Sequence, residues 1–200
     1  MIMQPIILAS ASAIRLALLR NAGVSLTAES ASIDESAVKL AFRAQDGSAE
    51  ACAMELAHIK AKHVSLRHPA ALVIGADQML DCGGLWYDKP QTLDQARTHL
   101  RTLRGKHHRL VTAVIVLCAG EQRWRTVVTA TLSMRALSDG FIEDYLSQIG
   151  DAAFATPGAY QLEERGAQLF DRVEGDFFTI LGLPLLPLLG FLRGQGVLAT

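Results

Sequence analysis

The sequence predicts an α/β fold built around an extended, mixed β-sheet. Segments with helical periodicity alternate with short apolar runs of the kind that form buried strands. Two long β-rich segments, HRLVTAVIVLCA and WRTVVTATLSMRAL, flank a short polar stretch and predict a long antiparallel hairpin. Of the 200 residues, 50% are hydrophobic and 20% are charged, which suits one domain or two small lobes that share a cleft.

The first element is a strand followed by a helix. Residues 6–8 are apolar and predict a buried strand, and the helix expected from Ala13 to Ala22 has Ser12 as its N-cap and Gly23 as its stop. Apolar residues occupy nearly every side of this helix, so we expect it to be buried on several faces.

Arg15 falls in the first turn of that helix, where a cation opposes the helix dipole. An anion bound at the same end would offset this cost, because free backbone N–H groups point there. The alternative is that Arg15 extends along the apolar surface into solvent.

The next elements are helical. The acidic pair Asp34-Glu35 precedes a short helix, and an alanine-rich helix is expected from Ala49 to Leu66, ended by Pro69. ALVIGADQML then predicts a buried strand that ends at an acid, Asp77. The turn DCGG follows it, and LWYDKP is expected to return as a partner strand.

The second half continues the alternation. TLDQARTHLRTLRG predicts a helix with a capping box of Thr92 and Gln95, and SDGFIEDYLSQIG predicts a helix between Ser138 and Gly150. TPGAYQLEERGAQ is rich in glycine and polar residues and is typical of a functional loop. LFDRVEGDFFTILG predicts a strand and turn, and LPLLPLLGFLR a terminal helix with Pro184 near its first position.

Composition excludes several classes of protein. The formal net charge is −1, so we expect no nucleic-acid duplex as partner. We expect neither a signal peptide nor a membrane span, since the apolar C-terminal run is short and broken by prolines. Three widely spaced cysteines indicate no disulfide framework, and a reducing cytoplasm is the expected compartment. His58, His63 and His68 are five residues apart, a spacing that does not place two metal ligands on one helix face.

Three polar residues are not explained by a core. Arg15 begins a helix, Asp77 ends a strand, and Lys89 precedes a proline. Open α/β sheets bind ligands beyond the carboxyl ends of their strands, where Arg15 and Asp77 are expected. Cationic side chains at a helix N-terminus can hold phosphate, and an aspartate beside them can bind a hard cation or orient water. Glu35 and Lys60 are further candidates, with a first-turn helix acid and a solvated lysine as the alternatives.

An ordered series of short motifs runs from residue 6 to about residue 187: LASASAIRLALL, Asp34-Glu35, ELAHIKA, GADQ, DKP, GKHHRLVT, GAYQLEERGAQ, VEG and LGLPL. In this order and spacing the series resembles the Maf family of nucleoside triphosphate pyrophosphatases. The resemblance implies a single domain over residues 1–200, with two lobes around a central nucleotide cleft. It also implies a cytoplasmic homodimer that depends on a divalent cation, Mg²⁺ or Mn²⁺. The implied reaction cleaves a nucleoside triphosphate between its α- and β-phosphates.

The same resemblance implies roles for individual residues. Asp77 takes the position of the family's general base, and Glu35, with Asp77, that of its metal site. The phosphate-binding positions are Ser12, Arg15, Lys60 and Lys89. Ala13, Ile14, Asp88 and Glu164 depart from the family pattern, and none of them removes an acid or lysine of the site.

Two positions bear on the base of the substrate. Gln78 and Glu163 match the branch that acts on 7-methyl-GTP rather than the branch that cleaves dTTP and UTP. A carboxylate accepts hydrogen bonds only, which suits the paired donors of a guanine edge. Ile14, however, cannot make the cation–π contact that an aromatic residue would offer a methylated guanine. A dTTP or UTP pyrophosphatase and a nucleotide-binding division regulator with little turnover remain as alternatives.

Overall fold

The computed structural model describes residues 4–199, which form two compact units. Residues 4–78, 112–128 and 177–199 make up the first unit, and residues 79–111 and 129–176 make up the second. Each unit has its own buried core and is described by itself.

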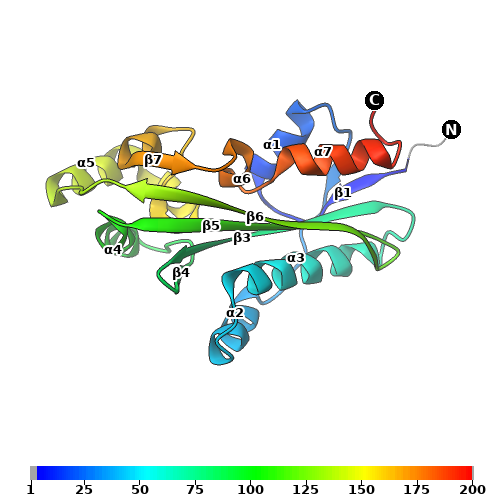
Figure 1. Ribbon diagram of the computed structural model, residues 1–200, viewed down its shortest axis with the longest axis horizontal. Helices are drawn as coiled ribbons and strands as arrows, with labels where there is room; N and C mark the ends of the chain where they lie inside the picture. The colour runs from blue at the N-terminus through cyan, green and yellow to red at the C-terminus, as the bar shows by residue number, and fades with distance from the viewer. Residues whose placement is uncertain (1–3, 200) are drawn as a thin grey trace. The chain divides into compact units, whose positions relative to one another are not determined.

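One sheet carries the architecture (Figure 1). Within residues 4–199 it contains seven strands, in the order β2-β1-β3-β5-β6-β7, with β4 paired to β3. β1 (Ile6–Leu8) runs parallel to β2 (Thr27–Ala28) and to β3 (Leu72–Cys82). β4 (Leu85–Tyr87) is antiparallel to β3, and β7 (Phe170–Glu174) is antiparallel to β6 (Glu121–Met134). The predicted α/β fold with a mixed sheet is therefore confirmed.

The predicted hairpin is formed by β5 (His107–Cys118) and β6, which are neighbours in the sheet. The strands have the expected lengths of 12 and 14 residues, but β6 begins at Glu121 rather than at Trp124, because the connection is only Ala119–Gly120. Both turn residues have positive φ, 53° and 80°, which is the conformation of a two-residue hairpin turn whose twist matches that of its strands.

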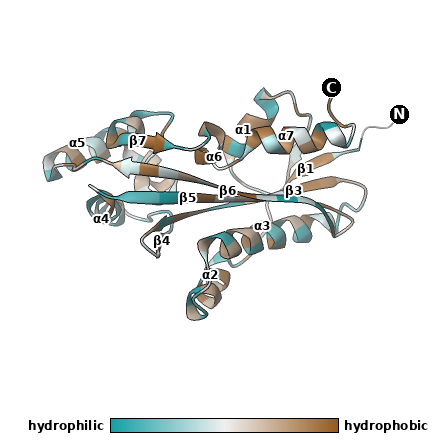
Figure 2. Cartoon of the chain, viewed as in Figure 1, coloured by the Kyte–Doolittle hydropathy of each residue, from teal (hydrophilic) through white to brown (hydrophobic). Residues whose placement is uncertain are grey.

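In the first unit, helices pack on both faces of the strands. The helices are α1 (Ala13–Asn21), α2 (Glu35–Ala44), α3 (Ala49–Ser65), α6 (Phe177–Ile180) and α7 (Leu185–Gly194). Figure 1 shows α3 on one side of the sheet and α1 and α7 on the other. β1, coloured as hydrophobic in Figure 2, is fully buried, and Leu8 and Ile74 lie in one apolar cluster with leucines of α7.

Two expectations about the first unit are wrong. Only Leu19 of α1 is buried, so this helix has one buried face and not several. Asp77 does not end a strand, because β3 continues to Cys82 and its last residues pair with β4. What ends near Asp77 is the parallel pairing of β3 with β1, whose last partners are Leu8 and Ile74.

In the second unit, α4 (Leu93–Leu103) contacts α5 (Asp139–Ile149), and Arg97 forms an ion pair with Glu143 between them. Both helices begin at their predicted caps, with Thr92 and Ser138 accepting backbone N–H groups. The segment expected as a loop contains 3-10 turns at Pro157–Ala159 and Arg165–Leu169, after a first one at Gly150–Phe154.

The chain's end differs slightly from expectation. Residues after β7 form α6 rather than only a turn, and Pro184 is the N-cap of α7 rather than its first helical residue. In the part of the chain that the structure describes, no helix combines the length and the apolar character that crossing a membrane requires.

Candidate active site

The first unit brings an ammonium group between two carboxylates. Nζ of Lys60 lies 2.6 Å from Oδ1 of Asp77 and 2.7 Å from Oε1 of Glu35. Lys60 comes from α3, Asp77 from β3, and Glu35 is the first residue of α2, capped by Asp34. Three candidate residues that are distant in sequence are therefore in direct contact.

Backbone packing explains how Lys60 reaches Asp77. Side chains of β3 alternate between the faces of the sheet, so Gly75 and Asp77 share the face covered by α3. A Cβ atom at Gly75 would lie 2.1 Å from the carbonyl oxygen of Ala57 and 2.8 Å from Cβ of Ala61. Only glycine permits this approach, which brings the Lys60 turn of α3 down onto the strand.

Asp77 is buried, with 5% of its surface exposed, and one of its oxygens has no partner. Oδ1 accepts the Lys60 bond, whereas Oδ2 is buried without a hydrogen-bond partner among the described residues. An unpaired buried carboxylate oxygen is costly, and it is an open acceptor for a water proton or a cation.

The pKa of Glu35 lies below its usual range. Burial of the side chain raises this pKa, but the charge and hydrogen bond of Lys60, together with the charges of Lys39 and Arg15, outweigh burial. Glu35 is thus an anion at neutral pH, and 43% of its side chain is exposed.

Ser12 and Arg15 occupy the predicted turn. The hydroxyl of Ser12 caps α1 by accepting from the backbone N–H of Arg15, at 3.3 Å. The Arg15 guanidinium donates from Nε to the carbonyl of Gly182 (2.7 Å) and from Nη1 to the carbonyl of Ala76 (2.9 Å). Nη1 also lies 3.4 Å from the hydroxyl of Ser10.

These contacts settle how Arg15 is held. It does not extend into solvent, so that alternative is wrong. Burial lowers the pKa of Arg15, while the negative charges of Asp77 and Glu35 oppose this shift. Arg15 therefore belongs to the same charged group as the Lys60 pairs.

Gln78 follows Asp77 in β3, and its side chain points to the opposite face of the sheet. Its Nε2 donates to Oγ1 of Thr112 (2.8 Å) and to the carbonyls of Thr179 (2.9 Å) and Ile180 (3.2 Å). Sequence reasoning did not identify Thr179, because a threonine within an apolar stretch carries no motif of its own.

Lys89 and Glu163 belong to the second unit. Lys89 is an exposed residue after β4, and its carbonyl accepts from the side chain of Gln91. Glu163 is exposed, in the turn between the last two 3-10 segments. His108 is buried in this unit, where Nε2 lies 2.7 Å from the hydroxyl of Tyr160.

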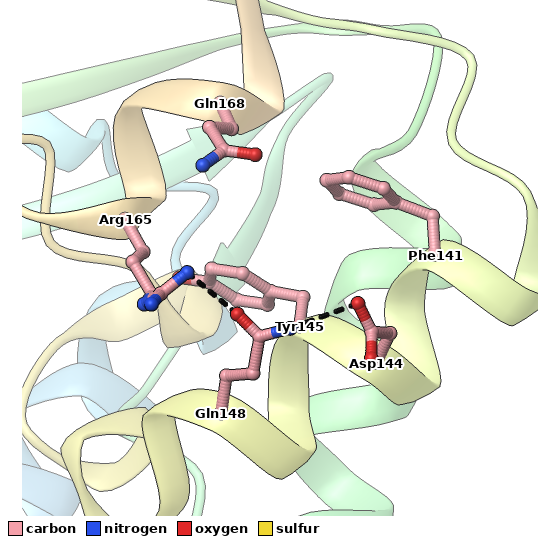
Figure 3. A pocket seen from close by; sticks show the side chains of 6 residues that line it. All are labelled: Phe141, Asp144, Tyr145, Gln148, Arg165 and Gln168. Atoms are coloured by element: carbon pink, nitrogen blue, oxygen red, sulfur yellow. Dashed lines mark hydrogen bonds between the residues drawn. The ribbon is translucent and has the colours of Figure 1, made fainter.

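The second unit also contains a pocket of about 180 Å³ between α5 and the 3-10 turn Arg165–Leu169. Figure 3 shows Gln148 bonded to both Arg165 and Asp144, with Nη1 of Arg165 2.6 Å from Oε1 of Gln148. None of the residues predicted for the site lines this pocket.

Few side chains near Asp77 could serve as ligands of a metal cation. Among residues 4–199, no group of three or more histidine, cysteine, aspartate or glutamate side chains is arranged to hold a metal ion. Glu35 and the open oxygen of Asp77 nevertheless fit a hard cation that takes its remaining ligands from water and phosphate.

Comparison with known proteins extends these observations over the whole chain. The sequence model of the family described as Maf-like protein matches residues 5–195. A protein of Granulibacter bethesdensis named nucleoside triphosphate pyrophosphatase is 48% identical over 195 residues, covering 98% of this chain and 99% of the relative. A protein of Rhodospirillum rubrum with the same name is 49% identical, covering 98% and 97%.

A further relative bears a more specific name. The Rhizobium meliloti protein named 7-methyl-GTP pyrophosphatase is 48% identical over 197 residues, covering 98% of this chain and 99% of the relative. Nearly complete coverage in both directions agrees with the ordered motifs and with the contacts among Glu35, Lys60 and Asp77. This chain belongs to the Maf-like protein family.

Proposed function

We propose that this chain is a metal-dependent nucleoside triphosphate pyrophosphatase. It hydrolyses the bond between the α- and β-phosphates and releases a nucleoside monophosphate and pyrophosphate. The names of its full-length relatives support a hydrolase of this class. The observation that carries the proposal is Asp77, a buried carboxylate with one oxygen paired to Lys60 and the other open.

Asp77 is the general base in this proposal. Its open oxygen, Oδ2, accepts the proton of the water that attacks the phosphorus, and Lys60 orients the carboxylate by donating a hydrogen bond to Oδ1. Proton transfer to a positioned side chain contributes roughly 10²- to 10⁴-fold to the rate.

Lys60 and Arg15 supply positive charge for the triphosphate. Nη2 of Arg15 is the part of the guanidinium that the bonds to Gly182, Ala76 and Ser10 do not use. The Ser12 turn adds the N-terminus of α1, and Lys89 is proposed as a further phosphate ligand. Charge-assisted bonds of this kind stabilise the negative charge that develops as the bridging oxygen departs.

Glu35 and Asp77 would hold the divalent cation, Mg²⁺ or Mn²⁺. A bound cation supplies neutralisation of phosphate charge and a lower pKa for a coordinated water. Glu35 is suited to this because it is ionised and partly exposed, while it stays tied to the site through Lys60.

For the base of the substrate, we propose a modified or non-canonical purine such as 7-methyl-GTP, recognised by Glu163. The carboxylate would accept from the paired N–H groups of guanine and would favour a methylated, cationic base. The name of the Rhizobium meliloti relative agrees with this choice. The rival substrates are dTTP and UTP.

The test is pyrophosphate release by the purified chain from 7-methyl-GTP, GTP, ATP, inosine triphosphate, CTP, dTTP and UTP, with Mg²⁺ or Mn²⁺. We expect release from 7-methyl-GTP above all others, and loss of activity in chelator. Release mainly from dTTP or UTP would overturn the proposal about the base and keep the reaction. Folded protein that releases pyrophosphate from none of them would overturn the reaction and favour a nucleotide-binding regulator.

A further inference from the structure

Both neighbours of Asp77 in the chain are tied to the same short segment. On one side, the carbonyl of Ala76 accepts from Arg15, and Arg15 also donates to the carbonyl of Gly182. On the other side, Gln78 donates to the carbonyls of Thr179 and Ile180. Residues 179–182 are therefore linked to β3 on both sides of Asp77, through the Arg15 side chain at Ala76 and directly at Gln78.

This arrangement lies inside the first unit, where the side chains of Arg15 and Gln78 are half-buried and rest on a buried pair of threonines. Thr112 and Thr179 are fully buried, and the hydroxyl of Thr112 both accepts from Gln78 and donates to the carbonyl of Thr179, at 3.0 Å. Bonds closed into such a network in a water-poor interior hold their members more rigidly than separate surface bonds do.

The segment 179–182 has a shape that only glycine allows at its end. Gly182 has φ of +98°, and a Cβ atom there would lie 3.2 Å from Nε of Arg15. The carbonyl that Arg15 uses is thus presented by a backbone conformation that other residues rarely adopt.

The direction of the Gln78 side chain determines which groups it can contact. Adjacent residues of a strand point to opposite faces, so Gln78 faces α6 while Asp77 faces Lys60 on α3. The side-chain nitrogen of Gln78 has two N–H groups, and three protein acceptors lie within 3.2 Å of it. Its donors are committed within the protein.

We infer that Gln78 is a positioning residue for Asp77 and not a contact to the base. Together with Arg15 and the segment 179–182, it fixes the backbone of β3 at the position of the proposed general base. The inference rests on the proposed function, since it gives Asp77 that role. It assigns to Gln78 an effect on the rate that is the same for every triphosphate.

The first test is kinetic and uses Gln78→Met, which keeps the length of the side chain and removes its donors. Displacement of a catalytic group by a fraction of an ångström to 1 Å costs up to about 10²-fold. We expect kcat to fall about 10- to 100-fold on every triphosphate that the wild type cleaves. The ratio of kcat/KM between 7-methyl-GTP and UTP should remain at its wild-type value. A residue that reads the base would change that ratio, with a higher KM for one base only, and this result would overturn the inference.

Two further variants are compared with Gln78→Met in the same kinetic assay. Thr112→Val removes one acceptor of Gln78, so we expect a smaller fall in kcat with the same unchanged ratio. Gln122→Met makes the same chemical change at an exposed position of β6 and should leave kcat at the wild-type value.

The second test does not depend on activity. Hydrogen exchange of the intact protein should become at least about tenfold faster in residues 75–78 and 179–182 in Gln78→Met, and not in Gln122→Met, because local opening frees these bonds. Unchanged protection in both segments would overturn the inference even if the wild type is active. Faster exchange with no pyrophosphate release by the wild type would remove the proposed function but leave the positioning of Asp77 supported.

Discussion

Lys60 and Asp77 form a buried ion pair in which the ammonium lies 2.6 Å from one carboxylate oxygen and the other oxygen has no partner among the described residues. Glu35 shares the same ammonium at 2.7 Å. One cation thus stabilises two carboxylates of different exposure. Asp77 is buried beside this cation, whereas 43% of the Glu35 side chain is exposed.

Replacement of Lys60 should lower the free energy of unfolding. Lys60→Met leaves the carboxylate of Asp77 buried without a cation, and breaking a buried pair in this way costs about 3–5 kcal/mol. We expect a loss of about that size in the free energy of unfolding measured with urea. The double variant Lys60→Met/Asp77→Asn should recover most of it, because no buried charge is left without a partner and Glu35, which also loses Lys60, is 43% exposed. Equal losses in the single and double variants would contradict this explanation.

Loss of the charge on Asp77 should remove turnover. We expect Asp77→Asn to lower kcat by roughly 10²- to 10⁴-fold in a pyrophosphate-release assay, because an amide cannot accept the proton of water. Asp81→Asn is the matched control. Asp81 lies on the same strand and is also buried, but its oxygens bind Arg109 and the backbone N–H of Gly84. This control should lose stability and retain kcat, and a comparable loss of kcat in both variants would argue against a special role for Asp77.

Gly75→Ala should separate α3 from β3. The added Cβ would meet the backbone carbonyl of Ala57 at 2.1 Å, and a backbone atom cannot rotate away. We expect a loss of about 3 kcal/mol in the free energy of unfolding, together with a lower kcat, since α3 carries Lys60. Gly140→Ala is the control, because nothing lies within 4 Å of its Cβ position in α5 and alanine favours a helix. A neutral Gly75→Ala would show that the two elements are less closely packed than described.

The pH dependence of stability should report on His108. Burial, with a smaller effect of the charge of His107, lowers the pKa of His108 from 6.5 to about 4. The unfolded chain therefore binds a proton between these pH values and the folded chain does not. The contribution of neutral, buried His108 to the free energy of unfolding is complete above pH 6.5. It is lost at roughly 1.4 kcal/mol per pH unit as the pH falls towards 4.

Urea unfolding at several pH values checks this directly. We expect His108→Gln to lose that part of the pH dependence between pH 4.5 and 6.5 and to match the wild-type slope above pH 7.5. Tyr160→Phe removes the hydrogen-bond partner of His108 but keeps the buried ring, so its slope should stay close to the wild-type value. An unchanged slope in His108→Gln would mean that this histidine does not titrate as its burial implies.

The sequence predicted the local features well because they depend on nearby residues. The caps at Ser12, Thr92 and Ser138 each bind a backbone N–H three residues ahead, so a short window contains all that is needed. The hairpin was also recognisable, from two apolar runs around a glycine-containing turn. Its exact connection was not, since AGEQR allowed several turn lengths.

Long-range contacts could not be predicted from local pattern. The apolar run before Asp77 suggested a strand end, but pairing of Leu80 with Tyr87 extends the strand. The apolar sequence of α1 suggested burial on several sides, yet only Leu19 is buried, because burial depends on which elements pack against a helix. The bond from Arg15 to Gly182 spans 167 residues and has no signature in either segment.

The contact of Gly75 with Ala57 has a consequence for how this protein can change. The backbone carbonyl of Ala57 and the Cβ atom of Ala61, and no larger side chain, set the separation of α3 and β3 at this point. Volume-conserving exchanges among leucine, isoleucine and valine elsewhere in the core should therefore have little effect on the spacing between the ammonium and its carboxylate. Thermal adaptation or directed evolution of the interior thus has such exchanges open to it, provided that position 75 stays glycine.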